Sequence, residues 1–280
     1  MPRTAYRDLP AALRAAVCER TGRVLEESPT RYGARSALTS ALSTESGLFF
    51  VKAAPADGQY AKGLRNEAAV NPYMKHLAAP LLWQIEAEGW LLLGFEHVAG
   101  RHEVYAPGSA SLDSLTRLLH ELADLPCPDV VTGSVARTWA GDGHELAEAM
   151  SGGSLLHTDL NPANLLLCES GRAVLTDWAW VSRGAAWVEI ALVLPRLIGH
   201  GHTAAQAEEW AAQFPAWRTA PPHALDAFAA RNLRRWEEAA ARGGDAAAWP
   251  TAMREATRQW HGHRLRQAGG RPPKTTCPSE

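Results

Sequence analysis

The chain has 280 residues, of which 46% are hydrophobic and 21% charged, a balance that excludes bulk disorder and suits one large domain or two lobes. Its formal net charge of −2 offers no basic excess for a phosphate backbone, so we expect no nucleic-acid partner. With no apolar stretch near the roughly 20 residues of a membrane span, no signal-peptide core and four dispersed cysteines, we expect no membrane partner and a cytoplasmic protein.

The first hundred residues predict a small antiparallel sheet with one inserted helix. A helix is expected over residues 10–27, where apolar residues recur at helical spacing after Pro10. Aromatic and β-branched residues in 48–52 indicate the best strand. The complete set of expected elements here is a helix over 10–27, two extended runs within 30–54, a helix over 59–77 that Pro72 bends, and a hairpin of 81–86 with 90–96.

The pattern becomes mainly helical after residue 100, with one exception. Residues 164–168 and 173–177 predict a strand pair joined by a tight turn at 169–172. The helices are expected over 111–125, 137–150, 185–199, 204–213, 223–242 and 249–267.

These elements predict an α+β, bilobal fold. We expect a small antiparallel-sheet N-terminal lobe over residues 1–98, with a hinge at its end, and a larger, mainly helical C-terminal lobe over 99–267. Residues 268–280 are rich in Pro and Gly, and we expect them to form a disordered tail.

Three polar residues around the predicted strand pair indicate a metal site. Asp159 and Asn164 lie five residues apart in the loop before the first strand, and Asp177 ends the second. Because a hairpin with a four-residue turn brings its open ends together, Asn164 and Asp177 should converge. Hard oxygen donors of this kind suit Mg²⁺. Asp159 is left to accept a proton from a hydroxyl nucleophile, and His157 fits as a buried organiser of the loop.

A metal site of this kind often serves phosphoryl transfer, which also needs a cation on the transferring phosphates. The predicted N-terminal lobe offers one candidate for that cation. Only four of the 28 basic residues are lysines, and Lys52 is the one at the end of the strongest strand. A lysine there supplies a compact charge with rotatable donors, as phosphoryl transfer needs. Glu67, on the helix that follows, is placed to hold the ammonium, with Glu86 and Glu88 as alternatives.

The order of these residues resembles the aminoglycoside phosphotransferase and choline kinase branch of the protein-kinase-like superfamily. The segment from His157 through Asp159 to Asn164 matches the H-x-D-x4-N loop of that family. Thr176-Asp177-Trp178 is similar to its Asp-Trp metal motif. The segment 184–191 is similar to the following helix, with Glu189 where the family usually has Asp. The resemblance spans roughly residues 30–240.

The resemblance implies a nucleotide- and Mg-dependent O-phosphotransferase that moves the γ-phosphate to a hydroxyl of a small molecule, an antibiotic or related metabolite. Asp159 would be the catalytic base, and Asn164 and Asp177 would be the metal ligands. Lys52 would contact the donor phosphates, with Glu67 as its ion-pair partner.

The resemblance also assigns the remaining nucleotide contacts and leaves the donor open. Residues 95–98 would be the hinge, where the backbone of Glu96 and Val98 reads the base. The stretch 32–38 has one glycine where protein kinases carry a Gly-rich loop, and Ser36 is its candidate phosphate contact. We expect ATP or GTP as the phosphate donor, and this loop leaves the choice between them open. Glu189 would be a structural support of the site.

The acceptor and the biological role stay open at this point. Residues 99–280 carry 20 acidic and 17 basic residues, a net of −3, which gives no support for a polycationic aminoglycoside over a neutral sugar, a nucleoside-type metabolite or another hydroxylated antibiotic. Two other functions are weighed: a kinase of peptide Ser/Thr in natural-product maturation, and a nucleotide-binding pseudokinase. The sequence leaves the oligomeric state and the choice between antibiotic resistance and biosynthesis undecided.

Overall fold

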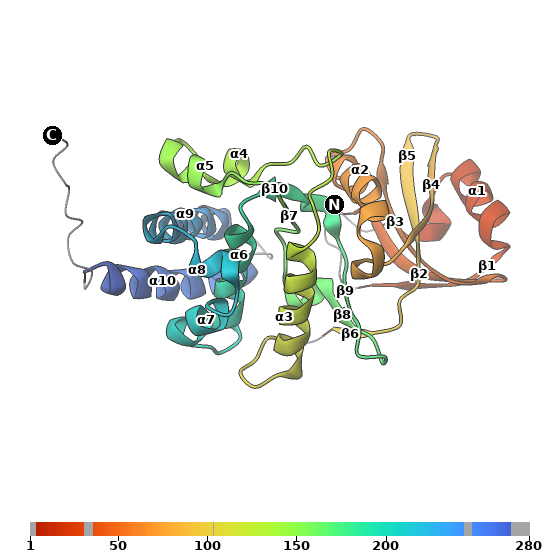
Figure 1. Ribbon diagram of the computed structural model, residues 1–280. Coiled ribbons are helices and arrows are strands. Elements are labelled where there is room, and N and C mark those ends of the chain that lie inside the picture. The colour runs from red at the N-terminus through yellow and green to blue at the C-terminus, as the bar shows by residue number, and fades with distance from the viewer. Residues whose placement is uncertain (1–3, 31–35, 103, 244–247, 270–280) are drawn as a thin grey trace. The chain divides into compact units, whose positions relative to one another are not determined.

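The computed structural model describes residues 4–30, 36–102, 104–243 and 248–269, and the chain divides into two compact units (Figure 1). Unit 1 consists of Met1–Val104, Ser109–Gly133 and Gly153–Arg183, and unit 2 of Tyr105–Gly108, Ser134–Gly152 and Gly184–Glu280. In the described ranges, no helix combines the length and the apolar character that a bilayer crossing needs.

We predicted a boundary between two lobes at residues 98 and 99. The two compact units divide the chain at other places, so this boundary stays a prediction. Segments 109–133 and 153–183, which we assigned to the second lobe, group with the sheet in unit 1. The predicted strand pair and the residues around it therefore belong to the same compact unit as Lys52 and Glu67.

Unit 1 is built on a five-stranded antiparallel sheet in the order β1-β2-β3-β5-β4. The two expected hairpins are confirmed, and the turn of the second contains Glu88 and Gly89, whose φ values of 48° and 75° match a two-residue type I′ turn. The strands are β1 (Val24–Pro29), β2 (Leu38–Thr44), β3 (Gly47–Pro55), β4 (Leu81–Ala87) and β5 (Trp90–Glu96).

The helix predicted over residues 10–27 is wrong after residue 21. The first helix, α1 (Ala11–Thr21), ends at Gly22, which has a φ of 70°, and β1 begins two residues later. A Cβ at Gly22 would lie 2.8 Å from the Glu45 carboxylate, so the chain turns here by using a conformation and a close approach that glycine allows. Val24, which we had placed on the helix, pairs with Thr44 instead.

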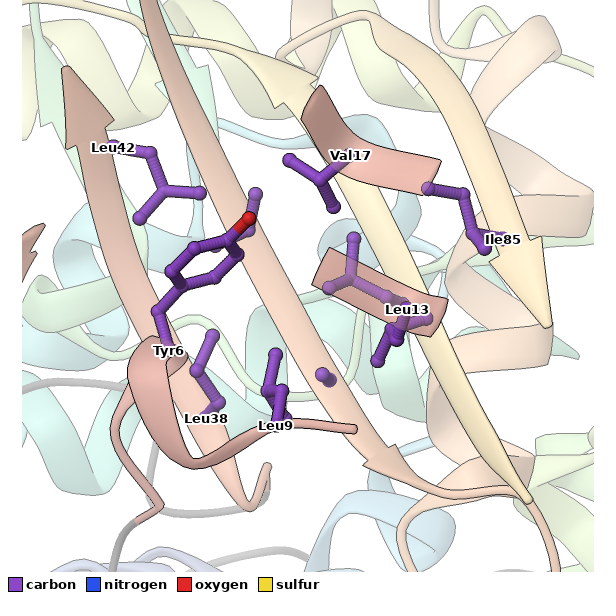
Figure 2. Packing of buried hydrophobic residues seen from close by; sticks show 10 residues of the cluster. Tyr6, Leu9, Leu13, Val17, Leu38, Leu42 and Ile85 are labelled. Carbon is purple, nitrogen blue, oxygen red and sulfur yellow. The ribbon is translucent and has the colours of Figure 1, made fainter. Parts of the chain in front are cut away.

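The helix α1 covers one face of the sheet. Leu13 and Val17 are fully buried in a cluster with side chains from four strands (Figure 2). The strand residues of this cluster are Leu38, Leu42, Val51, Ala53, Ile85 and Leu92. Burying this much apolar surface is what holds a short helix on a small sheet.

A second helix, α2 (Ala61–Val70), packs on the opposite face. Its Leu64 is buried with Ala54, Leu91 and Leu93, which alternate with the Val51, Ala53 and Leu92 of the α1 face. Because successive side chains of a strand point to opposite faces, Lys52 lies on the α2 side of β3. As expected from Pro72, α2 ends early and is followed by the 3-10 turns η2 (Asn71–Tyr73) and η3 (Lys75–Leu77).

The remaining elements of unit 1 are short apart from one helix, α3 (Ala110–Ala123). The predicted strand pair is confirmed as β8 (Leu165–Leu167) and β9 (Ala173–Leu175). Three strands of two or three residues were not predicted, because runs this short carry no readable alternation. The other elements are β6 (Arg101–His102), β7 (Ser154–Leu156), η4 (Pro162–Asn164), η5 (Trp178–Trp180) and β10 (Ser182–Gly184), where β6 extends the β8-β9 pair and β10 pairs with β7.

Unit 2 is helical in its described residues. The single helix predicted over 137–150 is wrong, because two helices flank a break at Gly141, whose φ is 64°. The tail predicted from residue 268 is corrected at its start: residues 268 and 269 complete the last helix, and 270–280 lie outside the described residues. The helices are α4 (Val135–Trp139), α5 (His144–Met150), α6 (Ala186–Gly199), α7 (Ala204–Ala211), α8 (Pro215–Arg218), α9 (Pro222–Ala241) and α10 (Ala248–Gly269).

We expect Gly94→Ala to destabilise the sheet. A Cβ at Gly94 of β5 would lie 2.3 Å from the ring of Trp83 on β4, so the indole must move. Overpacking of this kind lowers the free energy of unfolding by about 1–3 kcal/mol, which urea unfolding measures. Gly153→Ala is the control, because a Cβ there meets nothing within 4 Å. Equal stability of the two variants would contradict this account.

Candidate active site

Lys52 lies between two carboxylates that come from distant parts of unit 1. Its Nζ donates to Oε1 and Oε2 of Glu67 at 2.9 and 2.8 Å, and to Oδ1 of Asp177 at 3.1 Å. The Lys52 and Glu67 side chains are 5% and 4% exposed. The structure therefore brings together three of the predicted residues, from β3, from α2 and from the segment between β9 and η5.

The charges of this cluster do not cancel. One ammonium faces two carboxylates, which leaves one net negative charge. Burial pushes the pKa of Lys52 down, but the charges of Glu67 and Asp177 outweigh burial and raise it. Burial raises the pKa of Glu67, and Asp177 adds to that effect while Lys52 opposes it. The cluster thus keeps Lys52 protonated and favours a further cation beside Asp177.

Asp177 is held in a left-handed backbone conformation, with φ 66° and ψ 58°. A residue other than glycine in this region carries strain of order 1–3 kcal/mol and persists where its surroundings fix it. Here the next residue does so: the Trp178 N–H donates to Glu67 Oε1 at 3.3 Å, and its indole N–H donates to the Leu175 carbonyl at 3.2 Å. The buried tryptophan of the Asp-Trp pair thus holds the aspartate in place.

His157 is fully buried and connects the loop before β8 to the end of β9. Its Nε2 bonds to the Thr176 carbonyl at 2.9 Å, and its Nδ1 accepts from the Asp159 N–H at 3.2 Å. Together these bonds require the tautomer with the proton on Nε2. The imidazole also stacks edge-on against Trp178, with ring centroids 4.6 Å apart. These contacts are those of a loop organiser.

Asn164 joins Asp159 to the hairpin. Its Nδ2 donates to the backbone carbonyl of Asp159 at 2.8 Å and to the carboxylate Oδ2 at 3.3 Å. The Thr176 N–H donates to the Asn164 carbonyl at 2.9 Å, so Asn164 lies beside the residue that precedes Asp177. Since the amide nitrogen faces Asp159, the amide oxygen is the end of the side chain that can bind a cation.

The oxygen atoms at this site fit Mg²⁺, which keeps water and phosphate among its ligands, better than a metal ion bound entirely by protein side chains. Among the residues that the structure describes, no group of three His, Cys, Asp or Glu side chains could hold a metal ion. Mg²⁺ is commonly bound through one or two protein oxygens and completed by water and substrate phosphates. The Asn164 amide oxygen and the Asp177 carboxylate, next to a buried net negative charge, meet that requirement.

Four further predicted site residues remain, which are Glu96, Val98, Ser36 and Glu189. Glu96 is the last residue of β5, and its N–H donates to the Pro80 carbonyl at 2.9 Å. Val98 and Ser36 are half-buried, and residues 31–35 of the loop before Ser36 lie outside the described residues. Glu189 is buried on α6 in unit 2. The roles of these four residues stay predictions.

Two polar residues that the sequence reading did not single out contact η5. Asn66 Nδ2 donates to the Ala179 carbonyl at 3.1 Å, and Thr158 Oγ1 donates to the Trp180 carbonyl at 2.9 Å. Thr158 lies between His157 and Asp159 in the H-x-D-x4-N loop, so this motif could have pointed to it. Nothing in the local sequence distinguishes Asn66 from a solvent-facing helical residue.

The chain is similar to solved structures of small-molecule kinases, while no protein-family model and no curated protein sequence matches it. Choline kinase LicA from Streptococcus pneumoniae is 12% identical with a TM-score of 0.60, covering 90% of this chain and 100% of that one. An aminoglycoside phosphotransferase from Alicyclobacillus acidocaldarius is 12% identical with a TM-score of 0.63, covering 95% and 99%.

A third similar structure is a ternary complex of a thermostable mutant enzyme. The aminoglycoside phosphotransferase APH(4)-Ia, in a ternary complex with ADP and hygromycin B, is 15% identical with a TM-score of 0.55, covering 89% of this chain and 99% of that one. These likenesses confirm the predicted fold class, a protein-kinase-like fold with an antiparallel sheet followed by a mainly helical part.

We expect Lys52→Met to lower the free energy of unfolding by about 3–5 kcal/mol at neutral pH, because the buried Glu67 carboxylate and the partly buried Asp177 carboxylate lose their cation. The loss should shrink as the pH falls. The pKa of Glu67 is raised in the folded state, so the folded protein takes up this proton at a higher pH than the unfolded chain, and protonation removes the repulsion. Urea unfolding at roughly pH 7 and pH 5 measures the difference.

The matched control is Lys62→Met, since Lys62 is exposed on α2 and carries the same charge. Its effect should stay within about 0.5 kcal/mol at both pH values. A loss for Lys52→Met that is the same at both pH values would speak against the buried carboxylate pair.

Proposed function

We propose that this protein is a nucleotide- and Mg²⁺-dependent phosphotransferase that moves a γ-phosphate to a hydroxyl of a small molecule. The observation that carries the proposal is Lys52 Nζ bonded to both Glu67 and Asp177 in the compact unit that also holds Asp159 and Asn164. The fold supports it, because the similar structures are small-molecule kinases, among them LicA with AMP and APH(4)-Ia with ADP and hygromycin B.

The donor nucleotide would be bound by the residues around Lys52. The ammonium has three N–H groups, and its contact with Asp177 is the longest at 3.1 Å. That contact is the one a phosphate oxygen would replace, while the two bonds to Glu67 keep the ammonium aimed. Ser36 would add a phosphate contact, and the backbone at Glu96 and Val98 would read the base of ATP or GTP.

Asp159 would act on the acceptor. Its carboxylate Oδ2 already accepts a hydrogen bond from Asn164, which orients it, and it would align the acceptor hydroxyl and accept its proton. Asn164 and Asp177 would hold Mg²⁺. When bound, Mg²⁺ would neutralise the charge on the phosphate oxygens during transfer. His157 would keep the loop in position through Thr176.

The acceptor class that we propose is a hydroxylated antibiotic or related metabolite. An assay of ADP release with ATP or GTP, run across aminoglycosides, nucleoside antibiotics, sugars, choline and Ser/Thr peptides, tests this. Mass spectrometry should then find one added phosphate on the accepted compound. Transfer to peptides alone would replace the small-molecule proposal, and nucleotide binding without Mg²⁺ or turnover would replace it with a pseudokinase.

We expect Asp159→Asn to reduce kcat about a hundredfold to ten-thousandfold, because the amide cannot accept the acceptor proton. Nucleotide affinity should stay within twofold, since the substitution keeps the shape of the side chain. Steady-state kinetics and calorimetry measure the two quantities. Asp124→Asn, at the exposed end of α3, is the control and should leave both unchanged. Turnover near that of the unaltered protein in Asp159→Asn would rule out the assigned base.

A further inference from the structure

The backbone of η5 is held by side chains from outside its own turn. Its first N–H, that of Trp178, is bonded to Glu67. The Ala179 carbonyl accepts from Asn66 Nδ2 at 3.1 Å. The Trp180 carbonyl accepts from Thr158 Oγ1 at 2.9 Å and from Ser182 Oγ at 3.0 Å. A three-residue 3-10 turn is weak by itself, so these bonds decide where η5 lies.

One face of the helix α2 lies close against η5. Gly63, Asn66 and Glu67 are spaced three and four residues apart, which places them on the same side of the helix. A Cβ at Gly63 would lie 3.0 Å from the Ala179 Cβ, so η5 approaches this helix as closely as a glycine permits. Gly63 and Asn66 therefore both act on Ala179, one through its missing side chain and one through a hydrogen bond.

Two left-handed residues depend on this arrangement. Thr158, with φ 67°, precedes Asp159, and Asp177, with φ 66°, precedes η5. Strained residues of this kind persist only where neighbouring contacts fix them. Thr158 is fixed through its bond to Trp180, and Asp177 through the attachment of Trp178 to α2. Both strained residues are thus connected to the same three-residue turn.

We propose that Asn66 and Gly63 are positioning residues that hold η5 against α2, and thereby set the Asp177 carboxylate for metal binding and the turn that presents Asp159. The inference rests on the proposed function, because it assigns Asp177 to Mg²⁺. Neither residue contacts the reacting atoms. Asn66 acts through the Ala179 carbonyl, and Gly63 acts by leaving room for the Ala179 side chain.

Alanine substitutions separate this role from simple support of the helix. Alanine has a higher helix propensity than either asparagine or glycine, so Asn66→Ala and Gly63→Ala both favour α2 as an isolated helix. A role in helix formation alone would therefore leave metal affinity unchanged or improve it. A positioning role predicts weaker metal binding, because η5 loses a bond in one variant and is displaced by a few tenths of an ångström in the other.

The test measures Mn²⁺ binding by electron paramagnetic resonance, in the presence of a non-hydrolysable ATP analogue, on the full chain. We expect the Mn²⁺ dissociation constant to rise about five- to tenfold in Asn66→Ala, as for the loss of one hydrogen bond, and by a similar factor in Gly63→Ala, where η5 is displaced. Lys62→Ala, an exposed position of the same helix, is the matched control and should bind Mn²⁺ as the unaltered protein does.

A compensating pair makes the test specific. Ala179→Gly removes the methyl group that a Cβ at Gly63 would meet, so the double variant Gly63→Ala/Ala179→Gly should recover Mn²⁺ affinity relative to Gly63→Ala. Mn²⁺ affinity within twofold of the unaltered protein in both single alanine variants would overturn the inference and leave the proposed function standing. Absence of Mn²⁺ binding by the unaltered protein would overturn both.

Discussion

The contact of Lys52 with Glu67 and Asp177 is the constraint on which the rest of unit 1 depends. A buried ammonium is tolerated only when it is paired, and its partners here lie 15 and 125 residues away in sequence. To supply them, β3 must direct Lys52 toward α2, and the segment after β9 must come to the same point. The sheet faces, the placement of α2 and the position of η5 all satisfy this one requirement.

The parts that surround this contact are strained or tightly packed rather than relaxed. Asp177 and Thr158 have left-handed backbones, and a Cβ at Gly63 would lie 3.0 Å from the Ala179 Cβ, closer than an ordinary contact. Such features are stable only when several bonds agree on one geometry. Several contacts fix that geometry here. They are made by the buried Trp178, by the His157 imidazole and by the side chains that donate hydrogen bonds to η5. These contacts hold the oxygen atoms of the site in place in the structure itself.

The fold constrains the donor side of the proposed reaction more than the acceptor side. The similar structures share this fold at 12–15% identity, and the molecules bound in them include AMP, ADP and hygromycin B. In the proposed function, Lys52, Glu67, Asn164 and Asp177 would all serve phosphate and metal, which every such reaction requires. Acceptor choice depends on side chains that neither the fold nor this cluster specifies, and a screen of hydroxyl compounds therefore decides it.

The sequence by itself determined the local features of this protein. The hairpins at 44–47 and 88–89 were readable because alternation and turn residues are local properties. The order of Lys52, Glu67, Asp159, Asn164 and Asp177 was readable because it resembles the motifs of a known family. The tertiary structure decided the rest. Residue 22 ends α1 because its glycine turns left-handed against Glu45, and Asn66 meets Ala179 only because the chain returns 113 residues later. Packing partners distant in sequence leave no periodic signal, so only the folded structure reveals them.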